Sequence, residues 1–521
     1  MTTSNMSLWG PPQETVVTQL TCTIQAYFPQ LSTEDARQLV SESFHQSDLR
    51  YGLETAAAWA AGFRIPWSQV EQDIARFNTA GGSLVAVASR LRQERGGDRL
   101  TPERVERMVS PSNPDYDRMH RLAVCGIEVL VGSDFRPSGI DGRPPLRSKY
   151  KDSGGAVDRM VYEAFLSTNL AVALPISLLE RWLGVREILN FSASSWATKY
   201  GKACGRNVVD CRDGGGVSGL NSKEVQTMAD DLWERIHHPS LSTIVHMVLN
   251  FFKSAKQHDP SVSWDDVRLW KMDLSGAFTL LDFDPRVVPL LATELLGERE
   301  PIAVFYLCGL FGWTAMPMAF QVVTRTIKWE LAQPGVLCGL MDMYTDDMFG
   351  VCLQQDLAHD MDATRTFCKG LLGSTSIEER KTEFGRRLTI TGWDLDLDRM
   401  LVAISRKNAL KAFYGFSSVN LDDPVDVKKI QAWASWAERY GEICLFMRPF
   451  RCLLYGQIPY WARQMRGRQY KRVHLSADAK RVLRLYSALL ALTLLHETSH
   501  TPIYEFPGIY TVSCYLIRRM S

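Results

Sequence analysis

Two adjacent carboxylates, Asp346 and Asp347, stand in an otherwise apolar stretch that runs from residue 337 to residue 353. Both flanks of the pair read as β-strands, so we expect a tight turn between them. Carboxylates in an apolar setting are costly to keep ionised unless they hold a cation, and a divalent metal ion is the usual partner. The pattern therefore predicts a metal site at this turn.

A second apolar strand, Leu269–Leu274, carries the carboxylate of Asp273 near its end. With Asp346 and Asp347 it would supply the ligands for two metal ions about 4 Å apart, which is the arrangement that catalyses phosphoryl transfer. One ion would lower the pKa of an attacking hydroxyl group, and the other would neutralise charge on the leaving group. We expect Mg²⁺ here, with Mn²⁺ as a substitute. The alternative is that these are unrelated surface acids at strand ends.

The residues between these carboxylates resemble those of reverse transcriptases. The block from Gly309 to Gln321 matches the family's Phe-Gly, Pro and Phe-Gln positions, and the three blocks follow one another in the family's order and spacing. The resemblance implies that Gln321 holds the template–nucleotide pair. It also places Phe278, five residues after Asp273, where the family carries a bulky ring that collides with a ribose 2′-hydroxyl. Deoxynucleotides are therefore the expected substrates.

Two further segments extend this resemblance. Residues 199–210 resemble the family's fingers hairpin, in which Lys202 and Arg206 would hold the nucleotide triphosphate, since both are cations and Arg binds bidentately. Further along, the stretch that contains Lys381 resembles the family's block near the leaving pyrophosphate. Lys381 would then be a candidate general acid. The alternative is an ordinary solvated lysine.

Contacts to nucleic acid are expected at two more places. The resemblance places Tyr344, Gly392 and Trp393 against the template or primer, with the last two beginning a hairpin that grips the primer end. Residues 445–472 form a basic segment with interleaved aromatic rings and no Asp or Glu, a combination that suits a nucleic-acid track. Its alternative is a solvated basic surface over core aromatics. The cations of this segment are Arg448, Arg451, Arg463, Arg466, Arg468, Lys471 and Arg472.

The resemblance covers roughly residues 145–415 and is greatest to retrotransposon enzymes of the gypsy and DIRS type. It implies an RNA-directed DNA polymerase, a nucleotidyltransferase that extends a DNA or RNA primer with dNTPs on an RNA template. The implied fold is an α+β right-hand polymerase whose palm contains an antiparallel sheet. We expect a mainly helical extension at 1–140, fingers at 141–265, a palm at 266–405 with a fingers segment around 285–305, and a basic helical thumb or connection at 406–521.

Capping patterns and apolar periodicity predict the positions of several helices. Ser32 and Thr101-Pro102 read as the starts of two of them. Further helices are expected over 157–174, 223–257 with a break at Pro239, 432–447 and 476–495.

Composition limits the class of protein to which the chain can belong. With 521 residues, 45% of them hydrophobic, and a net charge of +1, the chain reads as an ordinary globular protein without a bulk preference for nucleic acid. Its eleven cysteines contain no C-x-x-C pair, which argues against a zinc ribbon or knuckle. The most apolar run, residues 486–495, is too short to span a bilayer. We expect a soluble intracellular protein, in the cytoplasm or the nucleus, of undefined oligomeric state.

Three rival interpretations stay open. One is an RNA-dependent RNA polymerase with the same palm, which Phe278 disfavours. Another is a catalytically degenerate relic that binds nucleic acid. The third is a zinc metalloprotease, because residues 496–500 read His-Glu-Thr-Ser-His at the end of an apolar helical run. No ribonuclease H segment is recognisable before Ser521, so the chain reads as a fragment or as a stand-alone polymerase.

Overall fold

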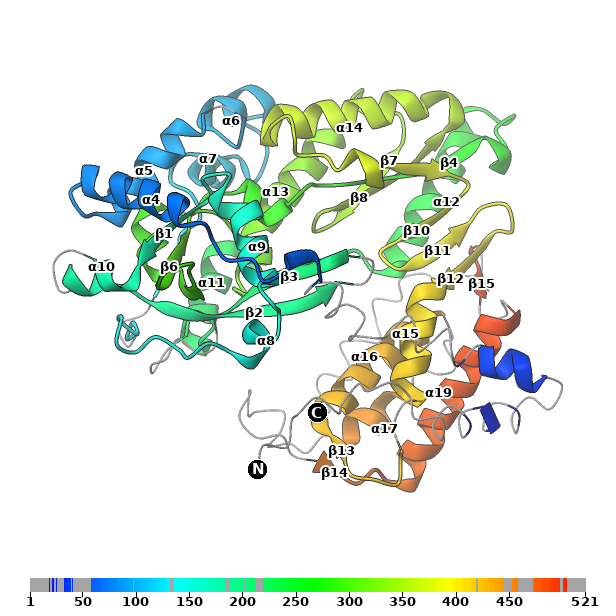
Figure 1. Ribbon diagram of the computed structural model, residues 1–521. Helices are drawn as coiled ribbons and strands as arrows, with labels where there is room; N and C mark the ends of the chain where they lie inside the picture. The colour runs from blue at the N-terminus through cyan, green and yellow to red at the C-terminus, as the bar shows by residue number, and fades with distance from the viewer. Residues whose placement is uncertain are drawn as a thin grey trace. The chain divides into compact units, whose positions relative to one another are not determined.

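The computed structural model divides into two compact units, each made of segments that lie far apart in the sequence. Unit 1 comprises Met1–Arg50, Ser240–Leu269 and Phe384–Ser521, and unit 2 comprises Tyr51–Pro239 and Trp270–Glu383. Figure 1 labels their elements. The structure describes residues 58–96, 98–131, 135–182, 187–199, 202–211, 219–417, 420–443, 449, 451–457, 472–496 and 500–503, and a few positions between 18 and 40.

A five-stranded sheet forms the first layer of unit 2. Its strands lie in the order β1 (Ala171–Pro175), β6 (Pro301–Tyr306), β5 (Ala292–Leu296), β2 (Phe191–Lys199) and β3 (Lys202–Asp210). Neighbours are antiparallel except β2 and β5, which run parallel. Every residue of β1 is buried, so this sheet belongs to the core of the unit and is not a half-exposed surface sheet.

A second sheet carries the candidate chemistry. Its order is β7 (Leu340–Tyr344), β8 (Asp347–Leu353), β4 (Val267–Asp273) and β9 (Glu383–Gly385). Gly350 of β8 lies over the indole of Trp270, where an added Cβ would come within 2.4 Å of the ring. A glycine is therefore needed at this point for β8 to lie against β4.

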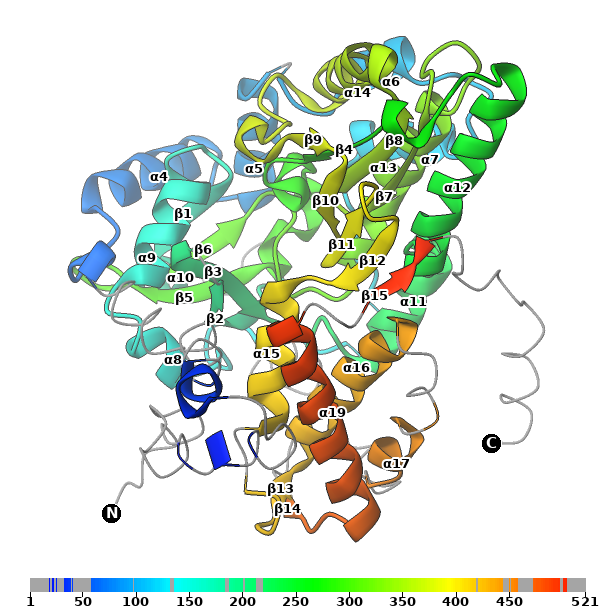
Figure 2. The ribbon, with the colours of Figure 1, turned by 90° about the vertical axis from the view of Figure 1, so that its right-hand side faces the viewer.

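Helices cover these sheets in unit 2 (Figures 1 and 2). The larger ones are α4 (Trp67–Thr79), α5 (Leu84–Glu94), α6 (Pro102–Met108), α7 (Tyr116–Val124), α9 (Ala156–Val161), α11 (Lys223–Trp233), α13 (Met316–Leu331) and α14 (Leu357–Leu372). Short ones are α8 (Ser148–Lys151) and α10 (Ile176–Arg181), a π-helical turn η2 (Tyr162–Leu166), and the 3₁₀ turns η4 (Ala277–Leu280), η5 (Pro285–Leu290), η6 (Gln354–Asp356) and η7 (Glu379–Lys381).

Unit 1 combines an antiparallel sheet with a helical bundle. The sheet order is β10 (Arg387–Ile390), β11 (Trp393–Asp396), β12 (Leu401–Ile404) and β15 (His500–Pro502). The bundle's stacked rings of Phe416 and Tyr486 have centroids 5.4 Å apart. The other elements are α12 (Leu241–His258), η3 (Trp264–Asp266), α15 (Arg406–Ser417), β13 (Val425–Asp426), α16 (Val427–Ile443), α17 (Arg451–Gly456), β14 (Arg472–Val473) and α19 (Ala477–His496).

The cap-based helix predictions are confirmed. Thr101 Oγ1 accepts a hydrogen bond from Arg104 N at 3.3 Å, and Pro102 is the first residue of α6. Ser32 caps the predicted early helix in the same way, since its Oγ accepts from Asp35 N at 3.0 Å. The predicted break at Pro239 separates α11 from α12.

One helix prediction is wrong in its second half. The run 157–174 begins as α9 and η2 but ends in strand β1. A short, wholly apolar run has the same composition in a buried strand as in a buried helix, so periodicity alone does not separate them.

The mixed helix-and-sheet content agrees with the predicted α+β class. The predicted division of the chain at 140, 265 and 405 stays a prediction. In the described part of the chain, no helix has the length and apolar content needed to cross a bilayer.

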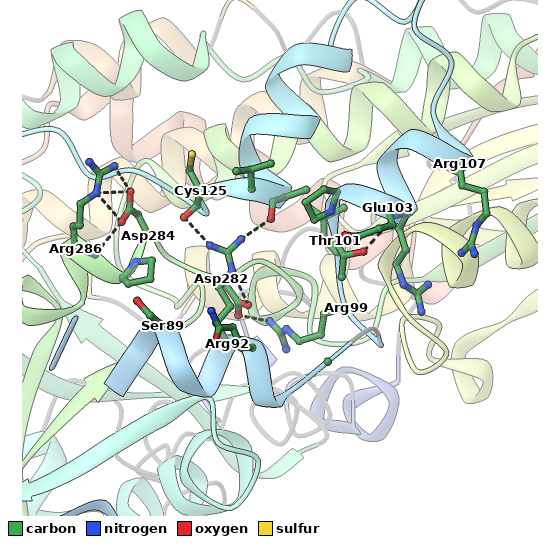
Figure 3. Close-up of a pocket in the computed structure, with 18 residues that line it drawn as sticks. Ser89, Arg92, Arg99, Thr101, Glu103, Arg107, Cys125, Asp282, Asp284 and Arg286 are labelled. Atoms are coloured by element: carbon green, nitrogen blue, oxygen red, sulfur yellow. Dashed lines mark hydrogen bonds and ion pairs between the residues drawn. The ribbon is translucent and has the colours of Figure 1, made fainter. Parts of the chain in front are cut away.

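A buried cluster of ionic contacts in unit 2 joins α5 to the loop that follows η4. Asp282, with its side chain 10% exposed, lies 2.9 Å from an Arg95 nitrogen and 3.0 Å from an Arg99 nitrogen, and Arg92 Nε lies 3.7 Å away. These contacts are ion pairs, and Asp282 Oδ1 accepts no hydrogen bond. Figure 3 shows Asp282 among arginine side chains at a pocket of about 920 Å³.

We predict that Asp282→Asn lowers the free energy of unfolding by about 3–5 kcal/mol, because buried guanidinium groups would lose their counter-charge. The matched control is Asp362→Asn. Asp362 also pairs with an arginine, Arg365, but its side chain is 74% exposed, so the cost should stay below about 1 kcal/mol. Urea unfolding of both variants measures the difference, and equal costs would contradict the buried-network interpretation.

Candidate active site

Two chain segments meet where β4 ends. Asp273, the last residue of β4, is 7% exposed. The next amide, Leu274 N, donates a hydrogen bond of 3.0 Å to the carbonyl of Asp346 in the β7–β8 turn. This contact and the pairing of β8 with β4 bring the strand carboxylate and the hairpin carboxylates into one neighbourhood.

The hairpin turn has an unusual backbone. Tyr344 pairs with Asp347, so the two-residue turn consists of Thr345 and Asp346. Thr345 has φ = 57°, a left-handed conformation that β-branched residues adopt only when their surroundings impose it. Thr324 of α13 helps to impose it, because its Oγ1 donates to Thr345 O at 3.0 Å.

Lys381 is brought to the same place by a long connection. It ends η7, and the carbonyl of Asp273 accepts a hydrogen bond of 2.9 Å from the Glu378 amide at the start of this turn. The Lys381 ammonium pairs with Asp273 Oδ2, while about half of the lysine side chain stays exposed. The structure therefore places Lys381 beside the strand carboxylate, and its role as a proton donor stays a prediction.

The donor chemistry of this site suits a hard divalent cation. Asp273 already attracts the Lys381 ammonium, and Asp346 and Asp347 add two more carboxylates at the partly or fully exposed turn. Oxygen ligands of this kind are those that Mg²⁺ prefers. In the described residues the three aspartates do not form a group with all donor atoms within 4.8 Å. The side chains on the turn would have to rotate for all three carboxylates to bind the same ion.

Phe278 lies on η4, directly after the Asp273 strand. Its half-buried ring packs against Phe311, with centroids 5.0 Å apart, and edge-on against Phe320 at 5.8 Å. These contacts fix the orientation of the ring. A bulky ring is thus held in place on the turn that follows Asp273, and its role in sugar discrimination stays a prediction.

The Gly309–Gln321 block is attached to the five-stranded sheet. Gly312 has φ = 115°, and an added Cβ would lie 1.8 Å from Val209 O of β3. Phe311 O accepts from Val209 N at 2.8 Å. Asn221 holds the other side of this loop, because its side chain donates to Gly312 O at 2.6 Å and accepts from Thr314 N at 2.8 Å. The loop is therefore fixed before α13 begins.

Gln321 has a different environment from the one that the resemblance implies. It is 6% exposed, its Oε1 accepts from His237 N at 3.2 Å, and its Nε2 donates to His237 O at 3.1 Å. Both ends of the amide thus brace the chain that carries His238. The structure favours this bracing role over a contact with the template–nucleotide pair.

Tyr344 is exposed at the end of β7 and stacks on His238, with ring centroids 4.1 Å apart and planes 20° apart. Partial burial, and then the neighbouring His237, lower the pKa of His238 below its usual value. The ring is therefore neutral at physiological pH, and it supports Tyr344 without adding charge.

The predicted triphosphate ligands lie on one strand. Lys202 begins β3 opposite Lys199 of β2, and Arg206 pairs with Ala197. The backbone thus forms the hairpin that the sequence predicts.

The remaining predicted contacts belong to unit 1. Thr391 and Gly392 form a two-residue turn between β10 and β11, with φ values of 49° and 90°. Trp393 is only 4% exposed, and Arg439 lies over its ring at 5.7 Å. The indole of Trp393 is therefore a core side chain of this unit, and the role of the hairpin at the primer end stays a prediction.

Part of the basic segment can be placed. Arg451 of α17 pairs with Glu438 at 3.0 Å, and Tyr455 donates to the same carboxylate at 3.2 Å. Arg472 is exposed in β14. Five predicted cations, Arg448, Arg463, Arg466, Arg468 and Lys471, lie outside the described residues.

The metalloprotease alternative lacks its structural context. His496 is the last residue of α19, whereas His500 begins β15 and pairs with Ala403 of β12. A zinc site of this type needs both imidazoles one turn apart on a single helix face, so the five-residue pattern is coincidental.

The sequence does not predict the roles of three side chains that support the site. Thr324, Asn221 and His238 act through contacts 21 to 106 residues away in the chain; they hold the turn, the loop and the tyrosine, respectively. Threonine, asparagine and histidine at such separations carry no spacing signal.

No protein-family model matches the chain, and no curated protein matches it either. Among solved structures, the chain is similar to a foamy viral protease–reverse transcriptase in complex with double-stranded DNA, at 12% identity and a TM-score of 0.40 over 75% of this chain and 59% of that one. The same enzyme in complex with an RNA/DNA hybrid gives 13% identity and a TM-score of 0.41 over 75% and 45%. Similarity at this level does not establish a shared fold, so the function proposed below rests on this chain's own residues.

The Thr324 contact yields a stability prediction with an internal control. Thr324→Val should lower the free energy of unfolding by about 1 kcal/mol, because it removes the donor to the Thr345 carbonyl. Thr326, two residues along the same helix, has a buried hydroxyl without a hydrogen-bond partner. Thr326→Val should therefore be neutral or stabilising. Chemical unfolding of both variants measures this, and a reversed order would refute the role of Thr324.

Proposed function

We propose that this chain is an RNA-directed DNA polymerase that extends a primer with dNTPs. The observation that carries the proposal is the junction of Asp273 with the Asp346-Asp347 turn through the Leu274 amide. Lys381 adds a cation at the same carboxylate, and Phe278 adds a fixed aromatic ring on the following turn. Carboxylates, a cation and a sugar-facing ring are the parts that templated nucleotidyl transfer requires.

Asp273, Asp346 and Asp347 would hold two Mg²⁺ ions. When bound, these ions would activate the primer 3′-hydroxyl and neutralise charge on the pyrophosphate leaving group. Asp273 would hold a metal ion in place of its pairing with Lys381, and the half-exposed lysine would be close enough to donate a proton to the departing pyrophosphate. Most of the catalysis would come from positioning and charge neutralisation.

The other residues would orient the substrates. Lys202 and Arg206 on the β3 hairpin would bind the triphosphate of the incoming nucleotide. Tyr344, supported by His238, would present its face beside the primer terminus. The cations of the basic segment in unit 1 would follow the nucleic-acid backbone. Origin in a retrotransposon of the gypsy or DIRS type is part of this proposal.

The proposal predicts that Asp346→Asn abolishes primer extension, with a loss of about 10³-fold or more, because metal ligation supplies several kcal/mol to this reaction. Binding of primer–template should change little. The matched control is Asp342→Asn, on strand β7 that leads into the turn, where the carboxylate pairs with Lys328. The assay is extension of a DNA primer on an RNA template with dNTPs and Mg²⁺. Extension by the Asp346→Asn enzyme at the control rate would refute the site.

The ring of Phe278 gives a prediction about the sugar. Phe278→Ala should raise incorporation of ribonucleotides relative to deoxynucleotides by about tenfold or more, since a steric clash with the 2′-hydroxyl would be relieved. Phe278→Tyr keeps the bulk and should keep the preference. The ratio of kcat/KM for dNTPs and NTPs measures the effect. A wild-type enzyme that prefers NTPs would favour an RNA polymerase instead.

A further inference from the structure

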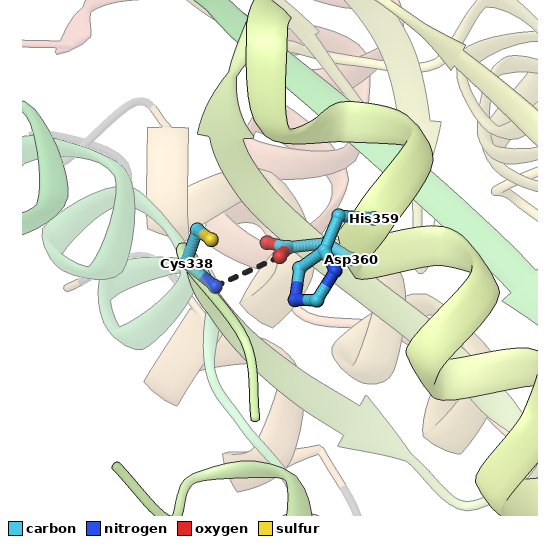
Figure 4. A group of neighbouring side chains, drawn as sticks. All are labelled: Cys338, His359 and Asp360. Carbon is cyan, nitrogen blue, oxygen red and sulfur yellow. Dashed lines mark hydrogen bonds between the residues drawn. The ribbon is translucent and has the colours of Figure 1, made fainter. Parts of the chain in front are cut away.

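A second group of potential metal ligands lies at the opposite end of strand β7 from the Asp346 turn. Cys338, His359 and Asp360 each offer one donor atom, and these three atoms all lie within 4.8 Å of one another. Cys338 belongs to the loop that enters β7, whereas His359 and Asp360 belong to the first turn of α14. Figure 4 shows the thiol and the imidazole beside the carboxylate of Asp360.

The carboxylate of Asp360 is held rigidly. Its residue is 0% exposed, and it accepts hydrogen bonds from the amides of Cys338 at 2.8 Å and Gly339 at 2.9 Å. A Cβ added to Gly339 would come within 2.8 Å of Asp360 Oδ2 and within 2.1 Å of Val351 O. The absence of a side chain at position 339 is therefore what permits the loop to approach α14. Each carboxylate oxygen keeps a further lone pair for a cation.

A hydrogen bond fixes the tautomer of the histidine. His359 Nε2 lies 3.2 Å from the carbonyl of Val336. A carbonyl only accepts hydrogen bonds, so Nε2 must carry the proton, which leaves the lone pair of the neutral ring on Nδ1. Metal-binding histidines commonly donate their other ring N–H to a carbonyl in this way, which fixes the tautomer.

The sulfur of Cys338 is accessible to an ion. The residue is exposed, and its thiol is not engaged in a disulfide. Its donor atom lies within 4.8 Å of those of His359 and Asp360. A divalent ion bound there would take the sulfur as a thiolate, since coordinating thiols lose their proton.

We propose that Cys338, His359 and Asp360 form a binding site for Zn²⁺. A thiolate, an imidazole and a carboxylate are the three ligand types that this ion takes in proteins, and three of them leave the fourth position of a tetrahedron for water or another ligand. The mixed sulfur, nitrogen and oxygen set distinguishes the site from the all-oxygen set at Asp273 and the β7–β8 turn, which suits Mg²⁺. The site would tie the entrance of β7 to α14, and it does not depend on polymerase activity.

The test is zinc binding to the full chain in competition with a chromogenic chelator. The wild-type protein should bind one more equivalent than the Cys338→Ser/His359→Ala variant, or bind that equivalent at least about tenfold more tightly. Both mutated residues are exposed, so the variant should fold, and Asp360 is left unchanged because it is buried. The matched control is Cys452→Ser, which removes another exposed free thiol and should leave the stoichiometry unchanged.

Two further readouts make the result specific. Replacement by Co²⁺ should give a sulfur-to-metal charge-transfer absorption that Cys338→Ser abolishes and Cys452→Ser retains. Zinc should also raise the melting temperature of the wild-type protein but not that of the double variant, because the ion binds the folded state. The proposal is overturned if wild-type and double variant bind zinc with the same stoichiometry and affinity.

Discussion

The hydrogen bond from Leu274 N to Asp346 O, together with the pairing of β4 with β8, holds the candidate active site together. It joins the residue after the β4 carboxylate to the turn that carries the other two carboxylates. Repulsion between like charges opposes such an approach, and it costs more where burial weakens solvent screening. The backbone hydrogen bond therefore holds together two segments whose carboxylates repel each other. Lys381 offsets part of this repulsion at Asp273. A bound cation would offset the remainder.

The surroundings of this contact fix its geometry. Thr345 is held in a left-handed conformation by the Thr324 hydroxyl, and Gly350 lets β8 lie directly on Trp270 of β4. Gly312 makes a similar close approach to β3, which carries the predicted triphosphate ligands. Strained or side-chain-free positions thus occur at the points where segments of unit 2 must approach one another. Strain of this kind persists where the surrounding structure imposes it, and it is often found at functional sites.

The sequence predicts local features of the fold and site well. Helix caps, the break at Pro239 and the position of the Asp pair at a two-residue turn are visible because each depends on neighbouring residues. Tertiary contacts are not visible in this way. The chain after residue 166 enters a buried strand, and Trp393 is a core ring.

Side chains that act across long separations are the hardest to predict. Gln321 braces a backbone 84 residues away, although its position in a familiar pattern suggested a substrate contact. The absence of a C-x-x-C pair argues against zinc ribbons and knuckles. Tertiary packing nevertheless brings Cys338 close to His359 and Asp360, which no spacing motif connects. A pattern in sequence reports which residue types are present, whereas the partner of each side chain depends on packing.

The central claim is that Asp273 and the Asp346-Asp347 turn share a metal site. Iron-directed cleavage tests it most directly, because Fe²⁺ bound in place of Mg²⁺ reduces added H2O2 to hydroxyl radicals that cut the nearby backbone. We expect cuts near both residue 273 and residue 346, suppressed by excess Mg²⁺, and the loss of both cuts in Asp273→Asn and in Asp346→Asn alike. If each variant lost only the cut at its own position, the carboxylates would not share an ion and the account would be contradicted.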